Sequence, residues 1–163
     1  MPYSTGHPTS GATLIFGIAY TAFRMTMGSP IETNWRTLAA MARAAAAQAY
    51  CPYSGFRVGA AVMSPEGVIA SGCNVENASF GLTICAERNA IFRAITDGAK
   101  VVAAVALYTP TPEPSTPCGA CRQVIAEFGA DAEIRCYCDG PRVATFTLRE
   151  LLPASFTLPA PRA

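Results

Sequence analysis

The chain has 163 residues, of which 51% are hydrophobic, so it can form one full core but is too short for two ordinary domains. Its 12 Lys and Arg residues nearly balance its 11 Asp and Glu residues, with no run of either sign, which excludes the charge pattern of a nucleic-acid-binding protein. We therefore expect a small, nearly neutral partner. Seven cysteines, an odd number, fit a disulfide-rich secreted protein poorly and indicate reduced thiols in the cytoplasm.

The first 29 residues differ in composition from the rest. They are rich in Ser, Thr, Gly and Pro, and their one apolar stretch, Ala12 to Phe23, is too short to cross a membrane. A secretory signal carries basic residues before its apolar region, whereas Arg24 follows this stretch. We predict a disordered or loosely packed arm over residues 1–29 and a folded domain over residues 30–163. Because Met25 and Met27 lie just before the first regular pattern, we expect one of them to be the biological start.

The first half of the domain predicts a helix followed by a hairpin. From Glu32 to Tyr50, apolar residues that are mostly alanine recur at helical spacing, and Pro52 ends the pattern. Two segments, Phe56 to Met63 and Val68 to Val75, are rich in small and β-branched residues. The residues between them, Ser64-Pro65-Glu66-Gly67, are typical of a turn.

Two further helices are predicted to begin at cysteines. Cys85 to Thr96 has helical spacing and is followed by Gly98, a typical helix end. Val101 to Tyr108 is a continuous apolar run, as expected for a central strand covered on both faces. Thr109 to Pro117 contains four prolines and predicts a loop, after which Cys118 to Phe128 predicts a helix.

The last segments complete an alternating pattern of helices and strands. Glu133 to Cys138 and Val143 to Phe146 predict two strands joined by the turn Asp139-Gly140. Leu148 to Leu152 predicts a short terminal helix. Alternation of this kind is typical of the α/β class.

Three cysteines have the spacing of metal ligands. Thiolates at positions i and i+3 of a helix lie about 5 to 6 Å apart, so Cys118 and Cys121 can share one metal ion. Cys85 can supply a third ligand from a facing helix. Structural zinc sites are closed by four protein ligands, whereas catalytic sites keep one position for water. Three ligands therefore favour a zinc-dependent hydrolase.

The other four cysteines lack this spacing. Cys136 and Cys138 share one face of a strand and have no metal spacing to the other group, so we expect a core role for both. Cys51 and Cys73 have no partner spacing and are interpreted as small buried residues.

Charged residues next to the ligands are candidates for the chemistry. Glu87 lies two residues after Cys85 and is predicted to move protons, although an exposed glutamate favoured by the helix dipole is the simpler alternative. Arg88 and Arg122 are candidates for hydrogen bonds to the thiolate sulfurs, which would lower their negative charge; the alternative for each is a solvated arginine. The case is stronger for Arg88, because three thiolates alone would weaken zinc as a Lewis acid.

Together the segments Cys85-Ala86-Glu87-Arg88 and Pro117-Cys118-Gly119-Ala120-Cys121-Arg122 resemble the cytidine deaminases of the small, homotetrameric type. The resemblance runs from about Trp35 to Phe156 and includes Tyr53 to Ala61, Gly72 to Gly81 and Glu150 to Pro153. It implies a three-layer α/β/α sandwich around a mixed five-stranded sheet and one Zn²⁺ per subunit. It also implies deamination of cytidine and 2'-deoxycytidine to the uridine nucleosides and ammonia, in pyrimidine salvage.

The resemblance also implies substrate contacts. Asn74 and Glu76 would hydrogen-bond a ribose hydroxyl, and Phe56 would pack against the pyrimidine ring. The backbone around Ala86 and the Glu87 carboxyl would contact the base edge, with Glu87 protonating N3.

Two aromatic residues match positions that the family contributes across subunit interfaces. These are Phe80 and Phe156, which would complete the pocket of a neighbouring subunit. Phe80 stands where relatives have Tyr, so one hydroxyl contact would be missing.

Three alternatives remain at this stage. A related aminohydrolase acting on a compound such as blasticidin S shares both cysteine segments, but Asn74-Val75-Glu76-Asn77 argues against it. Deamination within RNA or DNA would need a basic groove, which the nearly neutral charge of the chain argues against. The family resemblance also implies the free-nucleoside branch, because the first ligand is a Cys and not a His. The third alternative is a structural zinc or redox module without catalysis, which Glu87→Ala would distinguish.

Overall fold

A computed structural model describes residues 33–158 of the chain. The predicted arm over residues 1–29, and a start at Met25 or Met27, lie outside the described residues. No helix in residues 33–158 is both long enough and apolar enough to cross a membrane.

Five strands form one mixed sheet in the order β2-β1-β3-β4-β5. The predicted hairpin is present, since β1 (Gly59–Met63) pairs antiparallel with β2 (Ile69–Cys73). At the centre, β3 (Ala104–Tyr108) pairs antiparallel with β1 and parallel with β4 (Glu133–Tyr137), and β5 (Val143–Thr147) follows antiparallel to β4. All five residues of β3 are buried, which confirms the prediction of a central strand.

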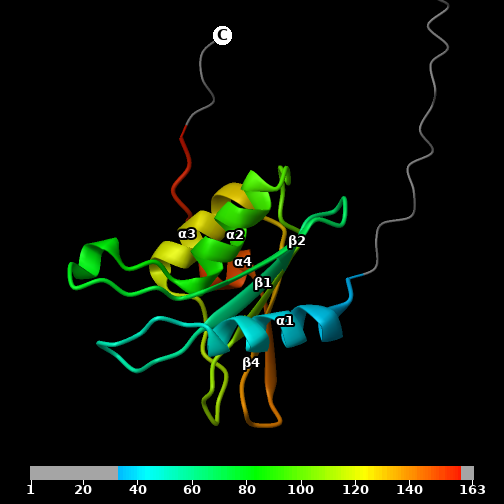
Figure 1. The fold of residues 1–163 in the computed structure, drawn as a ribbon. Coiled ribbons are helices and arrows are strands. Elements are labelled where there is room, and N and C mark those ends of the chain that lie inside the picture. Colours follow the sequence, from blue (N-terminus) through cyan, green and yellow to red (C-terminus); the bar gives the residue numbers. More distant parts are fainter. Residues whose placement is uncertain (1–32, 159–163) are drawn as a thin grey trace, which may run out of the picture.

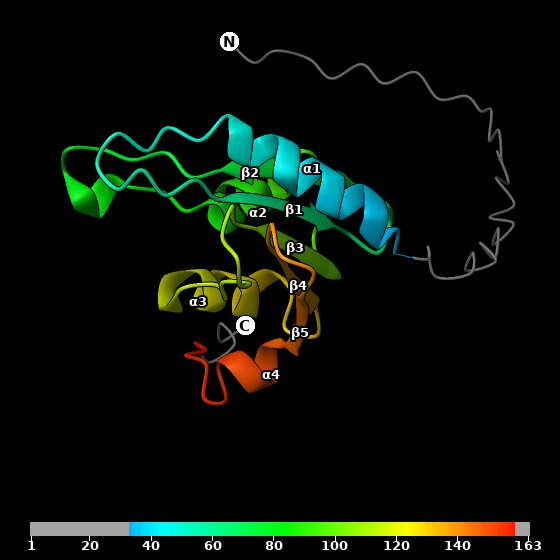
Figure 2. The ribbon, with the colours of Figure 1, turned by 90° about the horizontal axis from the view of Figure 1, so that it is seen from below.

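Helices cover both faces of this sheet, as Figures 1 and 2 show. On one face α1 (Trp35–Ala47) lies across β1, β2 and β3. On the other face α2 (Ala86–Thr96) packs on β1 and β2, with α3 (Gly119–Phe128) beside it and α4 (Leu148–Leu151) next to α3 and β5. The predicted three-layer α/β/α sandwich is confirmed.

The alternation of side chains along β1 builds a separate core on each face. Ala60 and Val62 contribute to the cluster under α2, whereas Ala61 and Met63 contribute to the cluster under α1. Because both faces are covered, the strand is apolar at every position, and its five residues are all buried.

Two glycines let the helices approach the sheet closely. A Cβ atom at Gly59 would collide with the backbone of α1 at Ala42, and one at Gly72 would collide with the backbone of α2 at Ala90. Since α2 carries Glu87 in its first turn, the small residue at Gly72 sets how deeply this helix seats on the hairpin.

Some boundaries differ from the prediction. Helix α1 ends at Ala47 instead of Tyr50, and β1 begins at Gly59 instead of Phe56, because the intervening residues leave the sheet as a loop. Cys85 and Cys118 have extended backbones and stand one residue before α2 and α3 as their N-caps.

The expectations for the remaining cysteines were right for one pair and wrong for the other. Cys136 and Cys138 are buried, as predicted for core residues. Cys51 and Cys73 are only half-buried, because both stand where the chain leaves regular structure, Cys51 after α1 and Cys73 at the last residue of β2.

Two loops extend together from one end of the sheet (Figures 1 and 2). One runs over residues 48–58, and the other runs over residues 74–85 and contains a 3-10 turn, η1 (Phe80–Leu82). Bridges join Tyr50 to Val75 and Val75 to Ile84, so the two loops lie side by side. The loop before β1 and the loop after β2 therefore both lie near the start of α2.

Candidate active site

The three predicted ligands meet at the adjacent N-termini of α2 and α3. Their Sγ atoms all lie within 4.8 Å of one another, with Cys85 3.9 Å from Cys118 and Cys118 3.5 Å from Cys121. Tetrahedral zinc with Zn–S bonds of about 2.3 Å places its sulfur ligands roughly 3.8 Å apart. The thiol triangle therefore has the size that zinc requires.

The helix N-termini favour thiolates at this position. Neither Cys85 nor Cys118 uses its side chain to cap its own helix, so both sulfurs remain available as ligands. The N-termini of both helices lie at the thiol cluster, so their free N–H groups and positive dipole ends act on the same sulfur atoms. This field offsets part of the negative charge that three thiolates bring.

The thiols are already polarised by their neighbours. A hydrogen bond from Cys121, assisted by Arg88 and opposed by burial, lowers the pKa of Cys85 to about 5. The same hydrogen bond, together with burial, raises the pKa of Cys121. Cys85 is therefore the thiol of this cluster that loses its proton most readily, and the thiolate is the form that binds metal ions.

Arg88 reaches the cluster from the first turns of α2. Its Nη2 donates to the backbone carbonyl of Thr83 at 2.9 Å and contacts Cys85 Sγ at 3.6 Å. Burial lowers the pKa of Arg88, but the hydrogen bond to Cys85 and the thiolate charges outweigh this and raise it. Its Nε atom is buried without a hydrogen-bond partner among the described residues. The two contacts of Nη2 hold the side chain against the sulfur.

Arg122 does not make the predicted contact with sulfur. Its guanidinium donates to the carbonyls of Pro117 at 2.7 Å and Leu151 at 2.9 Å, and to the Thr116 hydroxyl at 3.0 Å. The side chain runs toward the loop before α3 and the end of α4, where unpaired carbonyls are available. Arg122 therefore holds the loop next to Cys118.

Glu87 is a buried acid with 3% of its surface exposed. Burial raises the pKa of its carboxyl, and the negative charge of Cys85 raises it further, while the Glu87 backbone N–H opposes the shift. Glu87, Cys85 and Cys118 line the same cavity. The exposed-glutamate alternative is thus wrong for this residue, and the site holds an acid suited to proton transfer.

The cavity has a volume of about 280 Å³, which suits a small molecule. Three predicted contact residues line it: Phe56, Asn74 and Glu76. Seven further residues, which were not predicted, also line the cavity. Of these seven, only Ser54 and Val58 lie in a segment whose sequence resembles the cytidine deaminases. The seven are Ser54, Val58, Thr83, Leu107, Thr109, Ser115 and Thr116.

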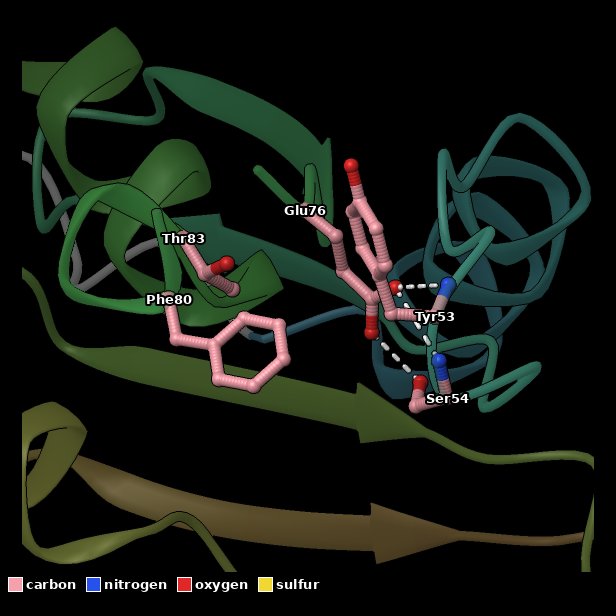
Figure 3. A pocket seen from close by; sticks show the side chains of 5 residues that line it. All are labelled: Tyr53, Ser54, Glu76, Phe80 and Thr83. Carbon is pink, nitrogen blue, oxygen red and sulfur yellow. Dashed lines mark hydrogen bonds between the residues drawn. The ribbon is translucent and has the colours of Figure 1, made fainter. Parts of the chain in front are cut away.

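Three predicted contact residues do not line this cavity within the chain. Ala86 is fully buried. Phe80 is 74% exposed and lines a neighbouring cavity with Tyr53, as Figure 3 shows. Phe156 is 68% exposed, and its backbone is hydrogen-bonded to the side chain of Gln123 on α3.

Residues 33–137 match the family described as the cytidine and deoxycytidylate deaminase zinc-binding region. The chain belongs to this family. A cytidine deaminase of Halalkalibacterium halodurans is 47% identical over 111 residues, which cover 67% of this chain and 83% of that protein. One from Sporosarcina psychrophila is 43% identical over 122 residues, covering 74% of this chain and 89% of that protein.

Solved structures of the deaminase family have the same fold. The cytidine deaminase of Burkholderia pseudomallei superposes with a TM-score of 0.72 and 42% identity, covering 76% of this chain and all of that chain. The cytidine deaminase of Mycobacterium tuberculosis superposes with a TM-score of 0.67 and 39% identity, covering 78% of this chain and all of that chain. Membership of the deaminase family and the size of the thiol triangle agree on zinc as the cofactor.

Proposed function

We propose that the chain is a zinc-dependent cytidine deaminase that converts cytidine and 2'-deoxycytidine, with water, to uridine or 2'-deoxyuridine and ammonia, in pyrimidine salvage. The observation that carries this proposal is the buried acid Glu87 beside three thiols of zinc spacing in one cavity. Relatives that are named cytidine deaminase, at 39–47% identity, support the choice of substrate.

Cys85, Cys118 and Cys121 would hold the zinc ion, which when bound supplies the Lewis acidity that makes water a nucleophile near neutral pH. Glu87 takes a proton from the water molecule that adds to C4 of the base and delivers it to N3. It then carries a second proton from the new hydroxyl group to the amino group on C4. The C4–N bond breaks, and ammonia leaves.

The raised pKa of Glu87 suits this work, because a carboxyl that both accepts and donates protons is most effective when its pKa lies nearer to neutrality. Arg88 keeps the thiolates from donating too much charge to the metal. We propose for Arg122 a role in holding the Thr116 and Pro117 segment beside Cys118.

Phe56, Asn74 and Glu76 line the cavity and are proposed to contact the nucleoside. The ring of Phe56 would pack against the pyrimidine, and the Glu76 carboxylate would accept from a ribose hydroxyl. The Asn74 side chain already bonds to the backbone at Phe56 and Val58, so its remaining N–H and lone pair would face the ribose. The backbone at Ala86 would contact the base edge.

We infer that the chain assembles as a homotetramer whose subunits share active sites. Phe80 and Phe156 are both strongly exposed and stand outside the cavity of Glu87 in their own chain, as is expected of residues given to a neighbour. Analytical ultracentrifugation tests the assembly. A stable monomer with full activity would contradict it.

We also infer a cytoplasmic location, because all seven cysteines are free thiols, as is typical of a reducing compartment. Cell fractionation tests this inference.

The proposed reaction is tested by measuring uridine and ammonia over a panel of cytosine nucleosides, with the zinc content per chain determined on the same samples. We expect one zinc per chain and equal amounts of both products from cytidine and 2'-deoxycytidine. A zinc-loaded protein that releases no uridine product from any member of the panel would refute the proposal.

A further inference from the structure

The loop segment from Tyr53 to Val58 has no regular strand partner and is held mainly by side chains from residues 74–76. Glu76 Oε2 accepts from the backbone N–H groups of Tyr53 at 2.9 Å and Ser54 at 3.2 Å. Its other oxygen, Oε1, accepts from the Ser54 hydroxyl at 2.5 Å (Figure 3). A carboxylate offers about four lone-pair positions. Three of those of Glu76 are therefore used within the loop.

The backbone of Phe56 is fixed on both sides of its ring. Its N–H donates to Ser54 Oγ at 3.0 Å, and its carbonyl accepts from Asn74 Nδ2 at 2.8 Å. The next residue but one, Val58, donates its N–H to Asn74 Oδ1 at 2.8 Å. Phe56 is 42% exposed, so burial constrains it only in part. These hydrogen bonds therefore fix the backbone from which the ring projects.

Within residues 33–158, Ser54 joins these two sets of bonds. A carboxylate cannot donate, so the single Ser54 proton goes to Glu76, and the Ser54 oxygen accepts from Phe56. The hydrogen bond from the Ser54 hydroxyl lowers the pKa of Glu76. Slight burial opposes this shift, and the N–H groups of Tyr53 and Ser54 assist it. Glu76 therefore stays an acceptor at neutral pH.

We propose that Ser54 is a positioning residue whose hydroxyl fixes the Phe56 ring relative to the Glu76 carboxylate, so that base and ribose are bound at a set spacing. This inference rests on the proposed function, which assigns Phe56 to the base and Glu76 to the ribose. Ser54 acts through these two residues. Removing its hydroxyl releases the Phe56 N–H and one Glu76 oxygen together, and affects binding more than the chemical step at Glu87.

The test compares Ser54→Ala and Ser54→Thr with Ser71→Ala, an exposed serine on β2 that lines neither cavity. Backbone amide exchange over residues 53–58 is measured by mass spectrometry without nucleoside, and KM and kcat for cytidine are measured separately. We expect Ser54→Ala to speed exchange and to raise KM, each about tenfold, with kcat within about twofold of the parent chain. Ser54→Thr keeps the hydroxyl and should show the exchange rate and the KM of the parent chain. Ser71→Ala should change neither quantity.

The two measurements separate this inference from the proposed function. Unchanged exchange and unchanged KM in Ser54→Ala, in a chain that deaminates cytidine, would overturn the positioning role alone. A fall in kcat at constant KM would overturn it as well. Faster exchange in Ser54→Ala, with no uridine from the parent chain, would refute the proposed function and leave the link between Phe56 and Glu76 supported.

Discussion

The Arg88 guanidinium lies 3.6 Å from Cys85 Sγ, and the carbonyl of Thr83 fixes it there at 2.9 Å. A positive charge at this distance draws electron density from the thiolate. A zinc ion held by these three thiolates would therefore be a stronger Lewis acid than one whose thiolates had no such charged partner.

We predict that Arg88→Gln lowers kcat or zinc affinity by about 10- to 100-fold, because partners of metal ligands typically have effects of this size. Steady-state kinetics and competition with a chelator measure the two quantities. Arg93→Gln is the matched control, since Arg93 lies on the same helix in an exposed pair with Asp97. Equal effects from both substitutions would mean that the contact with Cys85 is not what matters.

Glu87→Gln should keep its zinc and lower kcat by about 10² to 10⁴-fold, because the amide has a similar shape but cannot move protons. Zinc content and product release are measured on the same preparation. Glu127→Gln, an exposed glutamate on α3, serves as the control and should retain full activity. A Glu87→Gln variant with normal zinc and the parent kcat would contradict the catalytic role.

Zinc retention should separate the cysteines into two groups. Cys121→Ala removes a ligand and should leave far less than one zinc per chain after dialysis. Cys136→Ala should keep the metal, because Cys136 is a fully buried core residue on β4, where burial raises its pKa to about 12. Atomic absorption measures both. Loss of zinc from Cys136→Ala, in a folded chain, would contradict this separation.

Gly59→Ala should destabilise the fold by more than about 2 kcal/mol, because its Cβ would overlap the backbone of α1, which cannot move without lifting off the sheet. Thermal unfolding followed by circular dichroism measures the effect as a fall in Tm. Gly81→Ala is the control, since a Cβ atom there meets no atom within 4 Å. Equal Tm values for the two variants would contradict the close packing of α1 on β1.

The Asp139 carboxylate should make stability depend on pH at the acid end. Hydrogen bonds from the Tyr108 hydroxyl at 2.6 Å and from Arg43 at 2.8 Å lower the pKa of Asp139. A carboxyl with a lowered folded pKa stabilises the fold above its unfolded pKa of about 3.9, and this contribution is lost as the pH falls through the folded value.

The Tm difference between the parent chain and Asp139→Asn should therefore be constant above about pH 5 and shrink toward lower pH. Thermal unfolding across this range measures it, with Asp131→Asn, an exposed aspartate before β4, as the control. A difference that grows as the pH falls would reverse the predicted sign.

Much of the fold followed from the sequence because local patterns were strong. Alanine at helical spacing placed α1, and the apolar run up to Tyr108 placed the central strand. The end of α1 at Ala47 and the start of β1 at Gly59 did not follow from the sequence. The residues between them continue the helical or strand-like pattern, but in the fold they form a loop that is bridged to the neighbouring loop at Val75.

The sequence by itself predicted the candidate zinc ligands and the candidate acid, because Cys118 and Cys121 are three residues apart at the start of a predicted helix and Glu87 is two residues from Cys85. Such spacings fix geometry locally, whereas the meeting of Cys85 with Cys118 depends on the tertiary structure. Only the tertiary structure decided what the arginines and loop residues contact. Arg88 contacts sulfur and Arg122 contacts backbone carbonyls, although each directly follows a candidate site residue. The link from Glu76 through Ser54 to Phe56 depends on two loops meeting in space, which no spacing along the chain encodes.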